Sequence, residues 1–134
     1  MTNAEKVGEY LKKAEMFFVA TEDGDKPKVR PFSFYTIFED KIYFGVGTFK
    51  DCYKQIIANP NVEISASNGK GFLRYYGKAI FVENQALLDQ AFAEAPYLPK
   101  MYNETTGNKL GMFYLADATA EFRSLFEIEE SLSM

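Results

Sequence analysis

The chain contains no histidine, no tryptophan and a single cysteine, Cys52. Without histidine it cannot form a Ser-His-Asp or Cys-His catalytic centre, and most zinc sites are excluded as well. One cysteine cannot form an internal disulfide, which favours a reducing compartment such as the cytoplasm. We therefore predict no metal site and nominate no catalytic side chain. Any chemistry is expected to come from a bound group.

The chain also lacks long apolar runs and an excess of positive charge. No apolar run approaches the roughly 20 residues of a membrane-spanning helix, and polar residues follow Met1 where a secretory signal would be apolar. The formal net charge of −4 argues against a general nucleic-acid binder, because phosphate backbones favour basic surfaces. We expect neither a membrane nor a nucleic-acid partner.

Apolar and aromatic residues, by contrast, are plentiful. Of the 134 residues, 47% are hydrophobic and 16% are aromatic, which is typical of a folded protein. This length suits one domain with one core, and no linker or internal repeat divides it. We expect a single domain over residues 1–134.

Residues that commonly cap helices precede three apolar-periodic segments. We expect helices over residues 3–14 and 85–95, capped by Thr2 and Asn84, and a short helix that Thr48 and Asp51 open and that runs through Ile56 and Ile57. A short fourth helical piece is expected over residues 97–103.

Apolar and polar residues alternate in most of the remaining segments, which predicts strands. These strands are expected over residues 16–23, 28–38, 42–47, 62–67, 71–83, 112–117 and 118–129. Gly77 is expected to mark a bend, a turn is expected near Asp117, and the carboxylates of residues 127–130 are expected to form a solvated tail. Six or seven mostly antiparallel strands with short helices at their connections predict a mainly β barrel or sandwich.

Arg30 is a candidate anion ligand. Along its strand it shares a face with Phe32 and Phe34, which is unusual for a strand face that simply meets solvent. Pro31 has no N–H to donate to a sheet, so this stretch is expected at an edge with backbone groups free to bind something. The simpler alternative is a surface arginine whose aliphatic stem covers the aromatic rings.

A second candidate lies at the start of the helix that Thr48 is expected to cap. The hydroxyl of Thr48, the ammonium of Lys50 and the free N–H groups of the helix could converge on a phosphate. The alternative is an ordinary helix cap followed by a solvated lysine. Tyr97 and Tyr102 are among the tyrosines that could stack on a flat ring, or equally pack in a core or an interface.

Several segments, in their order and spacing, resemble the pyridoxamine 5′-phosphate oxidase-like superfamily of FMN-binding split β-barrels. The matching segments are FFVATEDGDKPKVRPFSF, DKIYFGVGTFK, DCYKQIIANPNVEISA and LRYYGKAIF. APYLPKMYN followed by FYLADATAEF is similar to the small branch near the nitroimidazole-reductase-like proteins. The resemblance implies a six- to seven-stranded antiparallel split barrel that forms a homodimer, with two FMN sites at the subunit interface.

The resemblance also implies which residues bind the cofactor. Two basic residues would hold the FMN phosphate with a threonine beside them, and two backbone stretches would run along the isoalloxazine ring and ribityl chain. Carried onto this sequence, the expected cofactor-binding residues are Arg30, Pro31, Phe32, Ser33, Phe44, Gly45, Val46, Thr48 and Lys50. The expected function is that of an FMN-dependent oxidoreductase acting on a small molecule. The alternative is a flavin- or ligand-binding module without turnover, such as a carrier, sensor or stress protein.

The chain departs from the better-known members of this superfamily. It has none of the histidine and tryptophan residues with which true pyridoxamine phosphate oxidases grip substrate and flavin. Phe72 stands roughly where family members place a glutamine near the flavin, and the histidine of nitroimidazole reductases is missing. Neither vitamin B6 oxidation nor nitroimidazole reduction is therefore expected. A barrel that has lost its cofactor and serves as a dimeric structural unit is a third possibility.

Overall fold

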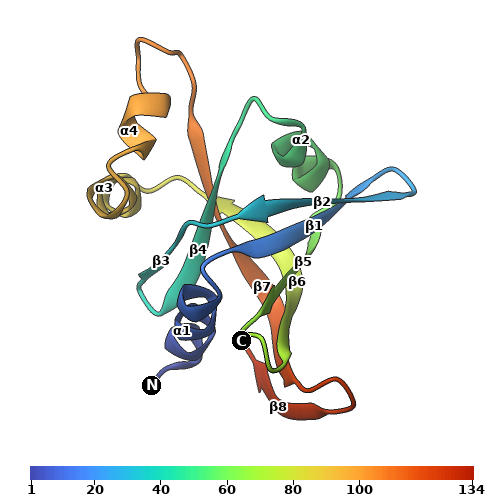
Figure 1. Cartoon of the computed structure of the whole chain (residues 1–134). Helices are drawn as coiled ribbons and strands as arrows, with labels where there is room; N and C mark the ends of the chain where they lie inside the picture. The colour runs from blue at the N-terminus through green and yellow to red at the C-terminus, as the bar shows by residue number, and fades with distance from the viewer.

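A computed structural model describes residues 1–134 and shows a mainly β protein with short helices at its connections (Figure 1). All eight strands belong to one antiparallel sheet, in the order β2-β1-β5-β6-β7-β4-β3 with β8 paired to β7. The strands are β1 (Phe17–Asp23), β2 (Lys26–Phe32), β3 (Tyr35–Phe38), β4 (Lys41–Gly47), β5 (Asn61–Ser67), β6 (Phe72–Val82), β7 (Leu110–Arg123) and β8 (Ile128–Ser133). The helices are α1 (Asn3–Ala14), α2 (Asp51–Ala58), α3 (Gln85–Glu94) and α4 (Leu98–Met101). The prediction of a mainly β antiparallel fold is confirmed.

Two of the three expected helix caps are confirmed. The Thr2 hydroxyl accepts the N–H of Glu5 at 3.1 Å, and the Asn84 carbonyl oxygen accepts the N–H of Leu87 at 3.2 Å. The expectation for Thr48 was wrong, because the residue at the N-cap of α2 is Lys50. The Thr48 N–H donates to the carbonyl of Lys109 at 2.9 Å. This bond extends the pairing of β4 with β7 by one step beyond the ends of the two strands.

The strand expected over residues 28–38 is two strands. β2 pairs with β1, whereas β3 pairs with β4, and these two strands form opposite edges of the sheet. Ser33 and Phe34 join the two edges and belong to no strand. Because this one expected strand is two, the structure has eight strands where the sequence predicted seven. Because the edges are joined here only by the chain itself, the barrel is split at this point.

The turn expected near Asp117 was also wrong. β7 runs through this position, where Asp117 has a φ of 49° and lies in an irregularity of the β6–β7 pairing. Gly77 lies in the same irregularity, and a Cβ on it would approach the carbonyl oxygen of Ala116 to 2.7 Å. The expected bend at Gly77 is therefore confirmed. The chain turns after Arg123 instead, so the residues expected as a solvated tail form β8, with exposed side chains.

An aromatic cluster fills the barrel. Phe17 and Phe113 each lie 5.6 Å from Phe44 between ring centroids, and all three side chains are buried. Tilted and edge-to-face contacts of this kind stabilise a core beyond the area that they bury. α1 covers the barrel with Val7 and Leu11, which are also buried. No helix of the structure is both long and apolar enough to cross a bilayer.

A smaller core cluster forms between the α3–α4 segment and the outer side of β4 and β7. It contains Leu87, Ala91, Ala95, Leu98 and Tyr102 from the helical segment, with Tyr43 and Met112 from the strands. In Figure 1, α3 and α4 accordingly lie beside β4 and apart from α1 and α2. This packing places α4 next to the split of the barrel.

Candidate functional site

A cavity of about 210 Å³ lies at the split of the barrel, and we call it the split pocket. It is lined by Arg30, Pro31, Phe32, Ser33, Phe34, Gly45, Val46, Lys50, Cys52, Tyr97, Leu98, Met101, Tyr102 and Leu110. These residues come from the end of β2 and the connection after it, the end of β4, the start of α2, the α4 segment and the start of β7. The fold thus brings most of the expected cofactor-binding residues to one place, although they are up to 20 residues apart in the sequence, from Arg30 to Lys50.

Two of the expected residues do not line the pocket. The side chain of Phe44 is completely buried in the aromatic core, and Thr48 lies outside the lining. Two larger hollows, of about 520 and 590 Å³, lie elsewhere on the surface. Each of them is bordered by three carboxylates, whereas the split pocket has none. Charge therefore distinguishes the split pocket as the site suited to an anion.

The N-terminus of α2 opens into this pocket without a cap. Its first backbone bond runs from the Lys54 N–H to the carbonyl of Lys50 at 3.3 Å, and Lys50 provides no side-chain acceptor. The N–H groups of Asp51, Cys52 and Tyr53 therefore have no hydrogen-bond acceptor within the protein. Such a helix end carries partial positive charge and unused donors, and both favour an anion.

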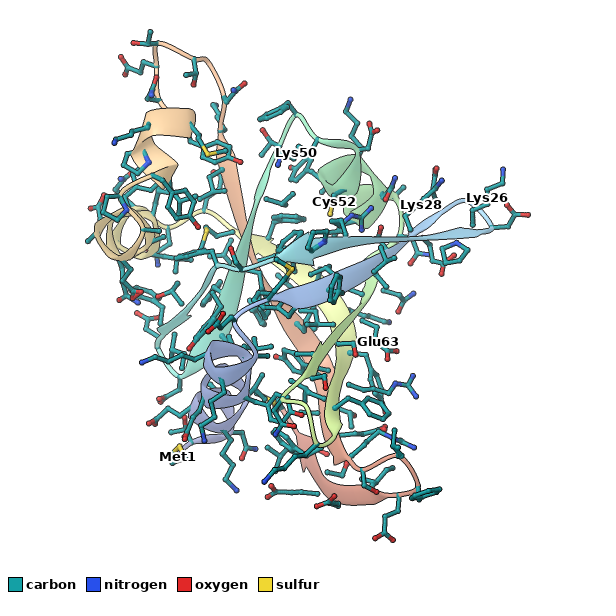
Figure 2. The ribbon with its side chains drawn as sticks, in the orientation of Figure 1. Met1, Lys26, Lys28, Lys50, Cys52 and Glu63 are labelled. Carbon is teal, nitrogen blue, oxygen red and sulfur yellow. The ribbon has the colours of Figure 1, made fainter.

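Lys50 adds a full positive charge at the same place. Figure 2 shows Lys50 and Cys52 together where the chain enters α2. The Lys50 side chain is exposed and takes part in none of the ion pairs of the protein. Its ammonium is thus available to a ligand. The sequence predicted a lysine close to an N-cap at Thr48, whereas in the structure Lys50 is itself the N-cap residue.

Arg30 is bound within the protein more tightly than either sequence interpretation allowed. Its Nη1 donates to the Thr21 hydroxyl at 2.7 Å and to the carbonyl of Val19 at 3.2 Å, and its Nη2 donates to Gln55 Oε1 at 2.8 Å. The Thr21 hydroxyl donates to the same Gln55 oxygen at 2.7 Å. Arg30 therefore fastens α2 to β1. Its Nε makes no hydrogen bond, so the guanidinium keeps a donor as well as its charge for the pocket.

Unpaired backbone completes the polar lining. Tyr35 and Phe44 form the last pair between β3 and β4, so Gly45 and Val46 pair only with β7. Ser33 and Phe34 belong to no strand. Backbone donors and acceptors on both sides of the split are thus free to bind a ligand, as expected for a polar ring system lying against main chain.

The wall contributed by α4 was largely missed by the sequence analysis. Tyr97 and Met101 line the pocket and remain 49% and 44% exposed, whereas Tyr102 is buried in the smaller core cluster. The tyrosines had been noted as possible stacking groups, but nothing local indicated Met101. Only the packing of α3 and α4 against β4 brings this segment to the split.

Cys52 lies in the pocket and is 6% exposed. Burial raises the pKa of its thiol, and the nearby charges of Arg30 and Lys50 only partly oppose that effect. A thiol with a raised pKa stays protonated at neutral pH and is a poor nucleophile. The pocket therefore suits binding of an anionic, partly flat molecule, and it contains no evident general acid or base.

The family model for pyridoxamine 5′-phosphate oxidase matches residues 4–121. The chain belongs to this family. A NimC/NimA family protein of Clostridium acetobutylicum, 31% identical, superimposes with a TM-score of 0.87 over 98% of this chain and 92% of that one. The family assignment made from the sequence segments is therefore confirmed, including the likeness to the nitroimidazole-reductase-like branch.

More distant members of the fold differ widely in sequence. General stress protein 26 of Bacillus anthracis is 16% identical, with a TM-score of 0.72 over the whole of both chains. A FAD-binding protein of Mesorhizobium loti is 13% identical, with a TM-score of 0.62 over 91% of this chain and 96% of that one. At such identities the likeness shows the fold alone. A comparison with curated proteins found no match.

Proposed function

We propose that this protein binds FMN in the split pocket and uses it as an oxidoreductase acting on a small molecule. The observation that carries the proposal is the uncapped N-terminus of α2 beside Lys50 and Arg30, in a lining without a carboxylate. Helix N–H groups and two cations are the donors that a terminal phosphate requires. The family supports the proposal, since a FAD-binding protein shares its fold.

The remaining lining fits the rest of such a cofactor. The unpaired backbone from Pro31 to Ser33 and at Gly45 and Val46 would hold polar edges of the ring and ribityl chain. Phe32 and Phe34 supply apolar surface that excludes water from the ring. When bound, FMN supplies hydride or electron transfer, whereas the protein binds and orients it. The same proposal makes the protein a cytoplasmic homodimer with its sites at the subunit interface.

The absence of an evident acid or base in the pocket favours a second candidate. Cys52 and the tyrosines are its uncharged titratable groups, and burial raises the pKa of Cys52 and of Tyr102. A pocket without a carboxylate or a histidine would also suit a flavin carrier or sensor. Reduction of the bound flavin by NADH or NADPH, followed by reoxidation by an organic acceptor, would favour the enzyme. A bound flavin that neither donor reduces would favour the carrier.

The test of the proposal is an absorption spectrum of the purified protein, followed by titration with FMN. We expect flavin bands or saturable binding of one FMN per subunit, and weaker binding of riboflavin, which lacks the phosphate. No binding at high micromolar FMN would overturn the proposal and would leave a split barrel for another ligand or for none.

A further inference from the structure

A second hollow, of about 520 Å³, lies away from the split pocket. It is lined by the start of α1, the β3–β4 turn, the middle of β7 and Met134, and we call it the terminal hollow. It shares no residue with the split pocket. In Figure 1 both chain termini lie in the lower half of the view, whereas α2 and α4, which line the split pocket, lie in the upper half. A ligand in the terminal hollow would therefore be separate from FMN.

Tyr75 places a hydroxyl without a partner in this hollow. The residue is 2% exposed, and its ring lies in the aromatic core, 6.4 Å from Phe44 between centroids. The hydroxyl makes no hydrogen bond, but it is not sealed off, since the sealed side-chain polar atom without a partner is Arg123 Nε. It therefore reaches open space, and the terminal hollow is the space that Tyr75 lines. A polar group held almost wholly within a core normally has a partner, and here that partner must come from outside.

Three carboxylates, those of Glu39, Asp40 and Asp117, border the same hollow, and we call them the rim carboxylates. All three residues are exposed, and none takes part in an ion pair. Lys41 is the single basic residue of the lining, and its ammonium lies 5.4 Å from the centroid of the Tyr114 ring. Three carboxylates against one ammonium leave an excess of negative charge. That excess favours a cation, and Lys41 shows that an ammonium group can rest against an aromatic ring here.

The third hollow, of about 590 Å³, does not offer this combination. Its Glu63 accepts from Arg74 Nη2 at 3.0 Å, and the hydroxyl of its Tyr76 donates to Glu121. These polar groups already have partners within the protein. Of the two acidic hollows, the terminal hollow is thus the one in which unpaired carboxylates meet an unpartnered, buried hydroxyl.

The separation of these groups indicates the kind of cation. Burial alone raises the pKa of Tyr75, with no contribution from a charge, so the rim carboxylates do not touch its hydroxyl. The rim carboxylates also do not gather into a set that could hold a metal ion. Buried apolar side chains, Ile42 and Leu115, form part of the wall. An organic cation with an apolar chain and a polar group at each end fits these features better than a metal ion does.

We propose that the terminal hollow binds a small aliphatic amine that carries a second polar group, such as a diamine or an amino alcohol. Its ammonium group pairs with the rim carboxylates, and its chain covers the apolar wall. Its second polar group bonds to the hydroxyl of Tyr75, which can both donate and accept. The site does not depend on the proposed function.

Titration calorimetry with four butane derivatives substituted at the chain ends tests the ligand class. Diaminobutane and aminobutanol should each bind saturably, one per chain. Butylamine lacks the second polar group and should bind roughly fivefold more weakly, as expected for one lost hydrogen bond. Butanediol has no charge and should not bind. Binding of butylamine as tight as that of diaminobutane, binding of butanediol, or no binding of any amine at millimolar concentration would overturn the proposal.

Two sets of substitutions locate the amine. Tyr75→Phe removes a hydroxyl that has no partner in the protein, so diaminobutane should then bind no better than butylamine. Glu39→Gln with Asp40→Asn should weaken both amines roughly fivefold. The control pair, Glu127→Gln with Glu129→Gln, removes an equal charge from exposed residues outside the hollow and should change little. Unchanged selectivity in Tyr75→Phe, or equal weakening by the two pairs, would overturn the proposal.

Lys41→Gln gives a test that misfolding cannot imitate. It removes the one positive charge of the lining, so diaminobutane should bind roughly twofold to fivefold more tightly. A damaged fold would lower the affinity instead. Unchanged or weaker binding of diaminobutane by Lys41→Gln, in a protein with the circular dichroism spectrum of the wild type, would overturn the proposal.

Discussion

Replacing Lys50 with alanine tests how much the phosphate contributes to FMN binding, independently of the ring and the ribityl chain. A hydrogen bond to a charged group contributes roughly 1.5–3 kcal/mol, and Lys50 is exposed, so we take the lower end. About 1.5 kcal/mol corresponds to a roughly tenfold higher Kd for FMN. Riboflavin has no phosphate, so its Kd should not change. The assay is titration of both ligands, followed by flavin fluorescence.

The structure supplies controls for this experiment. Lys50 makes no side-chain hydrogen bond, so its removal should leave thermal stability nearly unchanged. Lys54 is exposed on the same helix and outside the pocket, so Lys54→Ala removes an equal charge without the contact. The effect of Lys50→Ala should also shrink as salt is added. Equal weakening of FMN and riboflavin, or an unchanged Kd for FMN, would refute a phosphate site at this helix.

Two further substitutions and one labelling reaction probe the same pocket. Lys50→Asp supplies the missing cap, so it should stabilise α2 by about 1 kcal/mol, raise Tm and abolish FMN binding. Arg30→Ala removes the hydrogen bonds from the guanidinium to Thr21 and Gln55, which hold α2 against β1, and should cost roughly 1–3 kcal/mol in urea unfolding, whereas Lys28→Ala, exposed on the same strand, should cost little. Because burial raises its pKa, Cys52 should react with iodoacetamide more slowly than a free thiol at pH 8, and FMN should slow the reaction further.

Each of these predictions has a contradicting result. A Lys50→Asp variant with a lower Tm would show that α2 needs no cap. An Arg30→Ala variant as stable as Lys28→Ala would show that the bonds to α2 contribute nothing. Alkylation of Cys52 at the rate of a free thiol would show that the pocket wall opens readily.

Features that depend on neighbouring residues were predictable. Thr2 and Asn84 were recognised as caps because the donors that they satisfy lie three residues away in the chain. The bend at Gly77 followed from the lack of a side chain within a long strand. The order of the segments identified the family, which in turn pointed to Arg30 and Lys50.

Features that depend on pairing between distant segments were not predictable. Alternation continues across Ser33 and Phe34, so nothing local shows that the chain leaves one sheet edge there and joins the other. Asp117 resembles a turn residue, but pairing with β6 carries β7 through it. In both cases long-range hydrogen bonding overrode the local signal.

The difference between what the sequence determines and what only the tertiary structure determines is clearest at the split pocket. Composition alone ruled out histidine chemistry and disulfides, and the local pattern identified a basic helix start. Tertiary structure decided that the Arg30 guanidinium donates to Thr21 and Gln55, which lie 9 and 25 residues away. It also decided that α4 forms a wall of the site, because apolar packing against β4 determines where that helix lies. Chemistry available to the protein follows from which residues it has, whereas a site exists only where the fold brings them together.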